Sequence, residues 1–273
     1  MKTARRLWPS DPVDLARSLV PIGLLAVAAA VPVLRVAVVI VLGVGTAIAI
    51  ARDAPVRWSW AGALPIAISL AWGTLPAPLA APDGSDCTNL GSPVSTWRAI
   101  EALVVLAALA TLAVVLRASP ASLSVRWPAR RWVRWALVGF LVTGPIALVV
   151  GPYLARPFFG DIGYQVVAGA LLPALVFAVA NGVMEELIYR GALMGWSARV
   201  MGIGPAVVGQ ALVFGLAHSG SDVIGLPLPL MLALGVGGLL AGVIAVRTRS
   251  LLVPIAVHIG FDIPIYFAFA CPS

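Results

Sequence analysis

The chain has 273 residues, of which 61% are hydrophobic and 11% charged, and its mean hydropathy is +1.02. A soluble domain carries about 25% charged residues, so this composition excludes an ordinary soluble enzyme. The formal net charge of +7 does not indicate a nucleic acid partner, because the basic residues are scattered between apolar runs and form no single basic face. The composition indicates a polytopic membrane protein.

Continuous apolar runs predict an all-α fold, a polytopic transmembrane helical bundle. Barrel strands alternate in polarity over about ten residues, whereas several of these runs approach the roughly 20 residues that a spanning helix needs. The first two runs are short and separated only by Arg35, so they form either a tight hairpin or one irregular element. We therefore expect eight or nine spans. The runs fall at 18–34, 36–51, 60–80, 99–116, 135–155, 164–198, 205–221, 226–246 and 250–269.

The basic residues predict the orientation of the chain. With nine spans and the N-terminus inside, only Arg35, Arg98 and Arg156 fall in outer segments, and the rest of the 18 basic residues lie on the inner side. Inner loops of membrane proteins are enriched in lysine and arginine. This asymmetry predicts a multi-pass protein of the cell inner (plasma) membrane with a cytoplasmic N-terminus.

The segment 117–134 is the main predicted cytoplasmic connection. It combines five arginines with Trp127 and Trp132, a composition typical of a segment at an anionic lipid surface with its indoles at headgroup level. It also separates a front half without unusual polar residues from a back half that gathers them. We expect N-terminal membrane helices over 1–134 and a catalytic helical core over 135–273, within one continuous membrane domain.

The chain has two cysteines, Cys87 and Cys271. Their spacing matches no metal-binding motif, because such motifs place cysteines a few residues apart. A disulfide between the two is one alternative, and two unpaired thiols are the favoured interpretation.

The run from Met184 to Gly191 places two carboxylates and a guanidinium inside otherwise apolar sequence. Two of the chain's three glutamates, Glu185 and Glu186, stand side by side there. Ionisable groups at membrane depth are unfavourable unless they are paired or used in function, so this run is a candidate site. In an α-helix Glu186 and Arg190 can pair on one face, while Glu185 points about 100° away. The spacing therefore predicts one neutralised carboxylate and one free carboxylate, that of Glu185.

Both histidines of the chain, His218 and His258, lie in apolar segments of the back half. Counted from the predicted turns at one membrane face, these histidines, Glu185 and Asp262 lie roughly 13 to 21 Å deep at 1.5 Å per residue. His258 and Asp262 share a helix face, and Phe214 lies one turn before His218, where its ring would wall a pocket. Three helices can therefore present these groups to one buried site, where they activate water directly or through a bound metal.

Three motifs occur in order on these segments: Glu-Glu-x-x-x-Arg at 185–190, Phe-x-x-x-His at 214–218 and His-x-x-x-Asp at 258–262. In these motifs the sequence resembles the CPBP family, also called Abi or CAAX-protease-like proteins, which are intramembrane proteases. The resemblance covers about residues 164–269. Each motif alone is weakly specific, whereas three in order within membrane segments are specific together.

The resemblance implies roles for the first two motifs. Glu185 would be the general base that takes a proton from the attacking water, and His218 would help to hold that water. Glu186 and Arg190 would form a structural pair that fixes Glu185. The active site would lie buried among the C-terminal helices.

The third motif and the pocket follow from the same resemblance. His258 and Asp262 would stabilise the developing oxyanion or contribute to a metal site. Phe214 and Tyr189 would line the substrate pocket. The family has been described both as metal-dependent and as using glutamate without metal. The ligands of a zinc ion (Zn2+) would be Glu185, His218 and His258.

The predicted function is hydrolysis of a peptide bond in a peptide or membrane-protein substrate by water activated at Glu185, like that of a CAAX prenyl endopeptidase. The expected partners are this substrate and the lipid bilayer. A proton- or ion-coupled membrane transporter is one alternative, because buried acids, histidines and interrupted helices also mark ion pathways. A non-catalytic membrane scaffold of the same family is the other.

Overall fold

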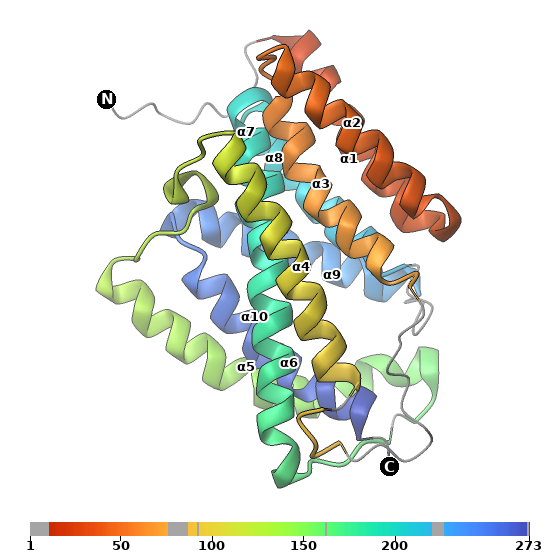
Figure 1. Cartoon of the computed structure of the whole chain (residues 1–273). Coiled ribbons are helices and arrows are strands. Elements are labelled where there is room, and N and C mark those ends of the chain that lie inside the picture. Colours follow the sequence, from red (N-terminus) through yellow and green to blue (C-terminus); the bar gives the residue numbers. More distant parts are fainter. Residues whose placement is uncertain (1–10, 76–86, 92, 162, 220–226, 272) are drawn as a thin grey trace. The chain divides into compact units, whose positions relative to one another are not determined.

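The computed structural model describes residues 11–75, 87–91, 93–161, 163–219, 227–271 and 273. All regular elements in these ranges are helices, which confirms the all-α helical bundle (Figure 1). The longer helices are α1 (Pro12–Ala30), α2 (Arg35–Ala51), α3 (Arg57–Trp72), α4 (Pro93–Val115), α5 (Arg130–Phe159), α6 (Leu171–Glu185), α8 (Ile203–Ala217), α9 (Leu228–Thr248) and α10 (Leu252–Ala270). The shorter elements are η1 (Pro32–Leu34), η2 (Pro120–Leu123), η3 (Ala168–Ala170), η4 (Glu186–Met194) and α7 (Gly195–Met201).

Among the described residues, 7 helical segments are long and apolar enough to cross a membrane. In the described parts of the predicted runs at 60–80 and 205–221 lie the helices α3 and α8, which have only 16 and 15 residues. A full span needs roughly 20 residues. The 7 candidate spans among the described residues are therefore fewer than the eight or nine spans predicted. The first two runs form separate helices joined by the short turn η1. The chain is a multi-pass membrane protein.

Helix α5 exposes a long apolar surface, which a membrane would cover. Leu137, Leu141, Val149 and Leu154 are each between 58% and 64% exposed. In water, a long apolar face of this kind drives association. Lipid tails instead accept the apolar side chains, and the helix satisfies its own backbone polar groups.

The chain divides into two compact units that interleave along the sequence. Unit 1 comprises Met1–Leu75, Val105–Arg126 and Leu187–Leu251, and unit 2 comprises Pro76–Val104, Trp127–Glu186 and Leu252–Ser273. The domain boundary expected at residue 134 falls inside unit 2.

In unit 1, α8 packs against α9 and α1, and α2 packs against α3. The segment before α5 is also fixed to this unit. Trp196 Nε1 donates to Ser122 Oγ at 3.1 Å, and Ser250 Oγ donates to the Arg126 carbonyl oxygen at 2.7 Å. These bonds join the end of α9 and helix α7 to the residues around η2.

In unit 2, α10 packs against both α5 and α6 (Figure 1). Thr143 Oγ1 on α5 donates to the Val257 carbonyl oxygen at 3.1 Å. A Cβ added to Gly260 would lie 2.6 Å from the Phe140 carbonyl oxygen. Small residues let helix backbones approach closely. Here Gly260 lets the backbone of α10 pack directly against the backbone of α5.

Cys87 and Cys271 form a disulfide in unit 2, with Cα atoms 5.5 Å apart. The expectation of two unpaired thiols is therefore wrong. The cysteines are 184 residues apart, so only the fold brings them together. Tyr266 O–H donates to the Cys87 carbonyl oxygen at 2.8 Å, and Gln165 N–H donates to the Cys271 carbonyl oxygen at 3.0 Å. The segment before α4 and the segment before η3 are thus bound to the end of α10.

The substitution Gly260→Ala tests the contact between α5 and α10. The added methyl group would meet the Phe140 carbonyl oxygen, so the two helices must move apart. We expect the free energy of unfolding to fall by about 1–3 kcal/mol, measured by circular dichroism during denaturant titration in micelles. Gly151→Ala on α5 is the matched control, because nothing lies within 4 Å of its Cβ position. Equal stability of the two variants contradicts the contact.

Candidate active site

Glu185 is the last residue of α6, and Glu186 begins the π-helical segment η4. π-helical turns have i→i+5 hydrogen bonds and occur frequently at functional sites. The predicted alignment of Glu186 with Arg190 assumed the α-helical period, so it does not carry over to η4. The Glu186–Arg190 pair itself would join the two units, and it stays a prediction.

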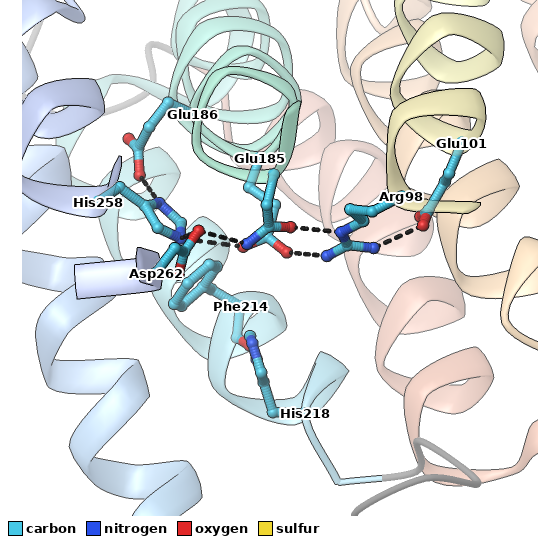
Figure 2. Close-up of polar contacts among 9 residues, drawn as sticks. Arg98, Glu101, Glu185, Glu186, Phe214, His218, His258 and Asp262 are labelled. Atoms are coloured by element: carbon cyan, nitrogen blue, oxygen red, sulfur yellow. Dashed lines mark hydrogen bonds and ion pairs between the residues drawn. The ribbon is translucent and has the colours of Figure 1, made fainter. Parts of the chain in front are cut away.

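Glu185 has a cationic partner within unit 2 (Figure 2). Arg98 Nη2 on α4 donates to Glu185 Oε1 at 2.8 Å. The expectation of a free Glu185 carboxylate is therefore wrong, because helical spacing reveals only partners one turn away and Arg98 lies 87 residues earlier. Glu185 is only 7% exposed, which strengthens this charge-assisted hydrogen bond.

Arg98 uses all three of its side-chain nitrogen atoms. Besides the bond to Glu185, Nη1 donates to Glu101 Oε2 at 2.6 Å and Nε donates to Asn181 Oδ1 at 2.6 Å. Asn181 Nδ2 in turn donates to Asp262 Oδ2 at 2.7 Å. The guanidinium thus links α4 to α6, and the Asn181 amide continues the network to α10.

His258 lies among three carboxyl groups (Figure 2). Its Nδ1 is 2.9 Å from Glu186 Oε1, and its Nε2 is 3.6 Å from both Glu185 Oε2 and Asp262 Oδ2. Of the four side chains predicted to share one site, Glu185, His258 and Asp262 lie together here, with Glu186 beside them. The place of His218 in this site stays a prediction. With Glu101, the cluster contains all three glutamates of the chain.

Four predicted site residues lie in unit 1, with three of them placed around the ring of the fourth, Phe214. The Arg190 guanidinium carbon is 4.2 Å from the ring centroid, a cation–π contact. The ring of Tyr189 packs edge-on at 5.1 Å, and the ring of His218 lies at 5.0 Å. These side chains form one aromatic and cationic cluster in unit 1.

The ring nitrogens of His218 have different roles. Nδ1 is 2.8 Å from the Phe214 carbonyl oxygen. A carbonyl oxygen can only accept, so Nδ1 carries the proton, and in the neutral ring Nε2 is the acceptor nitrogen. Whether this nitrogen approaches Glu185 depends on how the two units meet, and the predicted approach stays a prediction.

The donors expected for zinc, Glu185, His218 and His258, belong to both units. Glu185 Oε1 is bound to Arg98, and His258 Nδ1 is beside Glu186. Among the residues that the structure describes, no group of three or more His, Cys, Asp or Glu side chains could hold a metal ion. The zinc ion stays a prediction, which metal analysis of the purified protein tests.

Three members of the network, Arg98, Glu101 and Asn181, were not predicted. Arg98 was assigned to an outer connection, although its spacing of three from Glu101 is that of a helical ion pair. Asn181 lies one helical turn before Glu185, on the same face. These local signals were present in the sequence, but the bond from α4 to α6 is not visible in it.

Residues 167–264 match the family model described as type II CAAX prenyl endopeptidase Rce1-like. The match confirms the resemblance to CAAX-protease-like proteins, and it spans all three motifs from Glu185 to Asp262. Arg98 and Glu101 lie outside the matched residues. No curated protein and no solved structure matches the chain.

The substitution Asn181→Asp tests the network. An aspartate keeps the acceptor for Arg98 but loses the donor to Asp262 and brings a further carboxyl group beside it. We expect the free energy of unfolding to fall by about 1–3 kcal/mol, read from the thermal transition of tryptophan fluorescence. Asn89→Asp is the control, because exposed Asn89 accepts from the Gly91 N–H, its one side-chain bond among the contacts described, and an aspartate preserves that bond. A wild-type transition for Asn181→Asp overturns this assignment.

Proposed function

We propose that the protein is a membrane endopeptidase that hydrolyses a peptide or membrane-protein substrate with water activated at Glu185. The match of residues 167–264 to the model of type II CAAX prenyl endopeptidase Rce1-like proteins supports this proposal. The observation that carries the proposal is the buried cluster in which Glu185 and Asp262 flank His258 Nε2. Such a cluster supplies the proton acceptors and donors that hydrolysis needs. The family match favours hydrolysis over the transport alternative.

Glu185 is the proposed general base. Arg98 holds Oε1, while Oε2 points to the side of His258. A water molecule beside Oε2 gives it a proton as the water oxygen bonds to the peptide carbonyl carbon. When the carbon–nitrogen bond breaks, Glu185 returns that proton to the leaving amine. Proton and electron balance is complete without another reactant.

His258 is the proposed stabiliser of the oxyanion. Glu186 holds Nδ1, so the ring presents Nε2 to the reacting carbonyl. In its doubly protonated form, His258 donates from Nε2 to the developing negative charge. Asp262, when ionised, can only accept a hydrogen bond, so its proposed role is to orient this ring.

The unit 1 residues have proposed roles in binding. His218 accepts from the attacking water through Nε2, since Nδ1 is held by the Phe214 carbonyl oxygen. Phe214 and Tyr189 offer ring surfaces to the substrate, and Arg190 fixes the Phe214 ring by stacking on it.

The orientation in the membrane is a second part of the proposal. Disulfides persist in oxidising compartments and are rare in the cytosol. If the short helices α3 and α8 also cross the membrane, the nine-span arrangement places Cys87 and Cys271 on the outer side, which agrees with the disulfide between them. We therefore propose that the protein lies in the plasma membrane with its N-terminus in the cytoplasm.

Two substitutions test the chemistry. Glu185→Gln removes the proton acceptor and His218→Ala removes the nitrogen that holds the water, so each should slow cleavage by about 10²- to 10⁴-fold. The measurement is fluorescence release from a library of quenched peptides by the protein in liposomes. Asp161→Asn is the control, because the Asp161 side chain is 85% exposed and pairs only with exposed Arg156 among the contacts described. Wild-type cleavage by Glu185→Gln refutes the proposed base.

A labelling experiment tests the orientation. The chain has 2 cysteines, both in the disulfide, so a maleimide-polyethylene glycol reagent labels it only after reduction. In intact spheroplasts, a reductant that cannot cross the membrane should allow labelling. Inside-out vesicles treated in the same way should stay unlabelled. The reverse pattern places the disulfide in the cytoplasm and contradicts the proposed orientation.

A further inference from the structure

We propose that Arg98 is a positioning residue for the hydrolytic reaction, which holds Glu185 and, through Asn181, Asp262 in place on either side of His258 Nε2. The inference rests on the proposed function and adds a residue outside the family match, which begins at residue 167. It assigns to α4 a direct part in the geometry of the active site.

The first observation is the set of bonds at the guanidinium. Arg98 bonds Glu185 Oε1 through Nη2 and Asn181 Oδ1 through Nε, at 2.8 Å and 2.6 Å. The planar guanidinium fixes the angle between these two bonds, which a lysine ammonium cannot do. The Glu185 carboxylate is therefore held by one oxygen in a defined plane.

The second observation is that two series of contacts run from Arg98 to the ring of His258. One passes from Arg98 to Glu185, whose other oxygen is 3.6 Å from His258 Nε2. The other passes through Asn181 to Asp262 Oδ2, which is also 3.6 Å from Nε2. A single guanidinium thus sets the positions of both carboxyl groups that flank the reacting face of His258 (Figure 2).

The third observation concerns what holds Arg98. Its remaining nitrogen, Nη1, donates to Glu101 Oε2 at 2.6 Å, one turn along α4. Glu101 is only 4% exposed, so its carboxylate is largely shielded from water. An arginine that served only to balance the Glu185 charge would not need a second buried carboxylate behind it. Glu101 instead restrains the guanidinium in the orientation that serves Glu185 and Asn181.

A positioning role and a merely structural role predict different kinetics. Loss of positioning raises the barrier of the chemical step, because small displacements of a reacting group change the rate strongly. Substrate binding is not altered, so kcat should fall and KM should not change. A structural role would instead lower the amount of folded protein and leave kcat per folded molecule unchanged.

The test uses full-length protein in liposomes and a quenched peptide that the wild type cleaves. Arg98→Gln should lower kcat by about 10- to 100-fold at unchanged KM. Arg98→Lys should recover part of this loss, because it restores the positive charge beside Glu185 without the planar guanidinium that fixes the directions of the bonds. Glu101→Gln, which keeps the shape of the side chain, should lower kcat in the same direction but less.

Arg156→Gln is the matched control, because the Arg156 side chain is 66% exposed and pairs with exposed Asp161. It should retain the wild-type kcat. If Arg98→Gln does not fold, Arg98→Lys and Glu101→Gln decide the matter by their kcat values. Wild-type or faster kcat in the folded Arg98 and Glu101 variants overturns the inference, as does a loss confined to KM. If Glu185→Gln also cleaves at the wild-type rate, the proposed function is wrong. If Glu185→Gln does not cleave but the Arg98 and Glu101 variants do so at the wild-type rate, only the positioning role of Arg98 is wrong.

Discussion

The ion pair between partly buried Arg98 and buried Glu185 is the interaction on which the site depends. A carboxylate at membrane depth is unfavourable unless it is paired, and Arg98 supplies the charge and the direction of the bond. From this pair the network extends to Glu101 on one side and to Asn181 and Asp262 on the other. The polar cluster can therefore exist inside helices whose other side chains are mostly apolar.

The packing of unit 2 supports this network at its edges. Gly260 permits α10 to approach α5 closely, and His258 and Asp262 lie within one turn of it on the same helix. The disulfide between Cys87 and Cys271 joins the segment before α4 to the end of α10. Arg98 lies near the start of α4, so a covalent bond stands close to the helix end that carries the cation. The close packing at Gly260 and the disulfide thus both restrain α4 or α10, the helices that carry Arg98, His258 and Asp262.

The parts of the site that were predictable from sequence are those with a local signal. Glu185, Glu186, His258 and Asp262 stand out because they are ionisable groups in apolar segments, and estimating depth from helix rise brought three of these positions to a common level. Helical spacing also placed Phe214 beside His218, as observed. These inferences need only the period of a helix and the polarity of the membrane.

The parts that were not predictable depend on contacts between distant segments or on departures from regular geometry. The pairing of Glu185 with Arg98 and of Cys87 with Cys271 requires knowledge of which helices are neighbours. The π-helical geometry of η4 changes the spacing after Glu186, and no residue type in that run marks it. The number of candidate spans among the described residues is lower than predicted because α3 and α8 are shorter helices than the apolar runs suggested.

The most direct test of the central claim compares the membrane proteomes of cells that contain the wild type and cells that contain Glu185→Gln. If Glu185 activates water for peptide hydrolysis, at least one membrane polypeptide should be shortened only in the wild-type cells, and its uncleaved form should accumulate in the variant. Asp161→Asn cells should match the wild type. Identical polypeptide termini in all three strains, with each protein inserted at the same level, would contradict the claim.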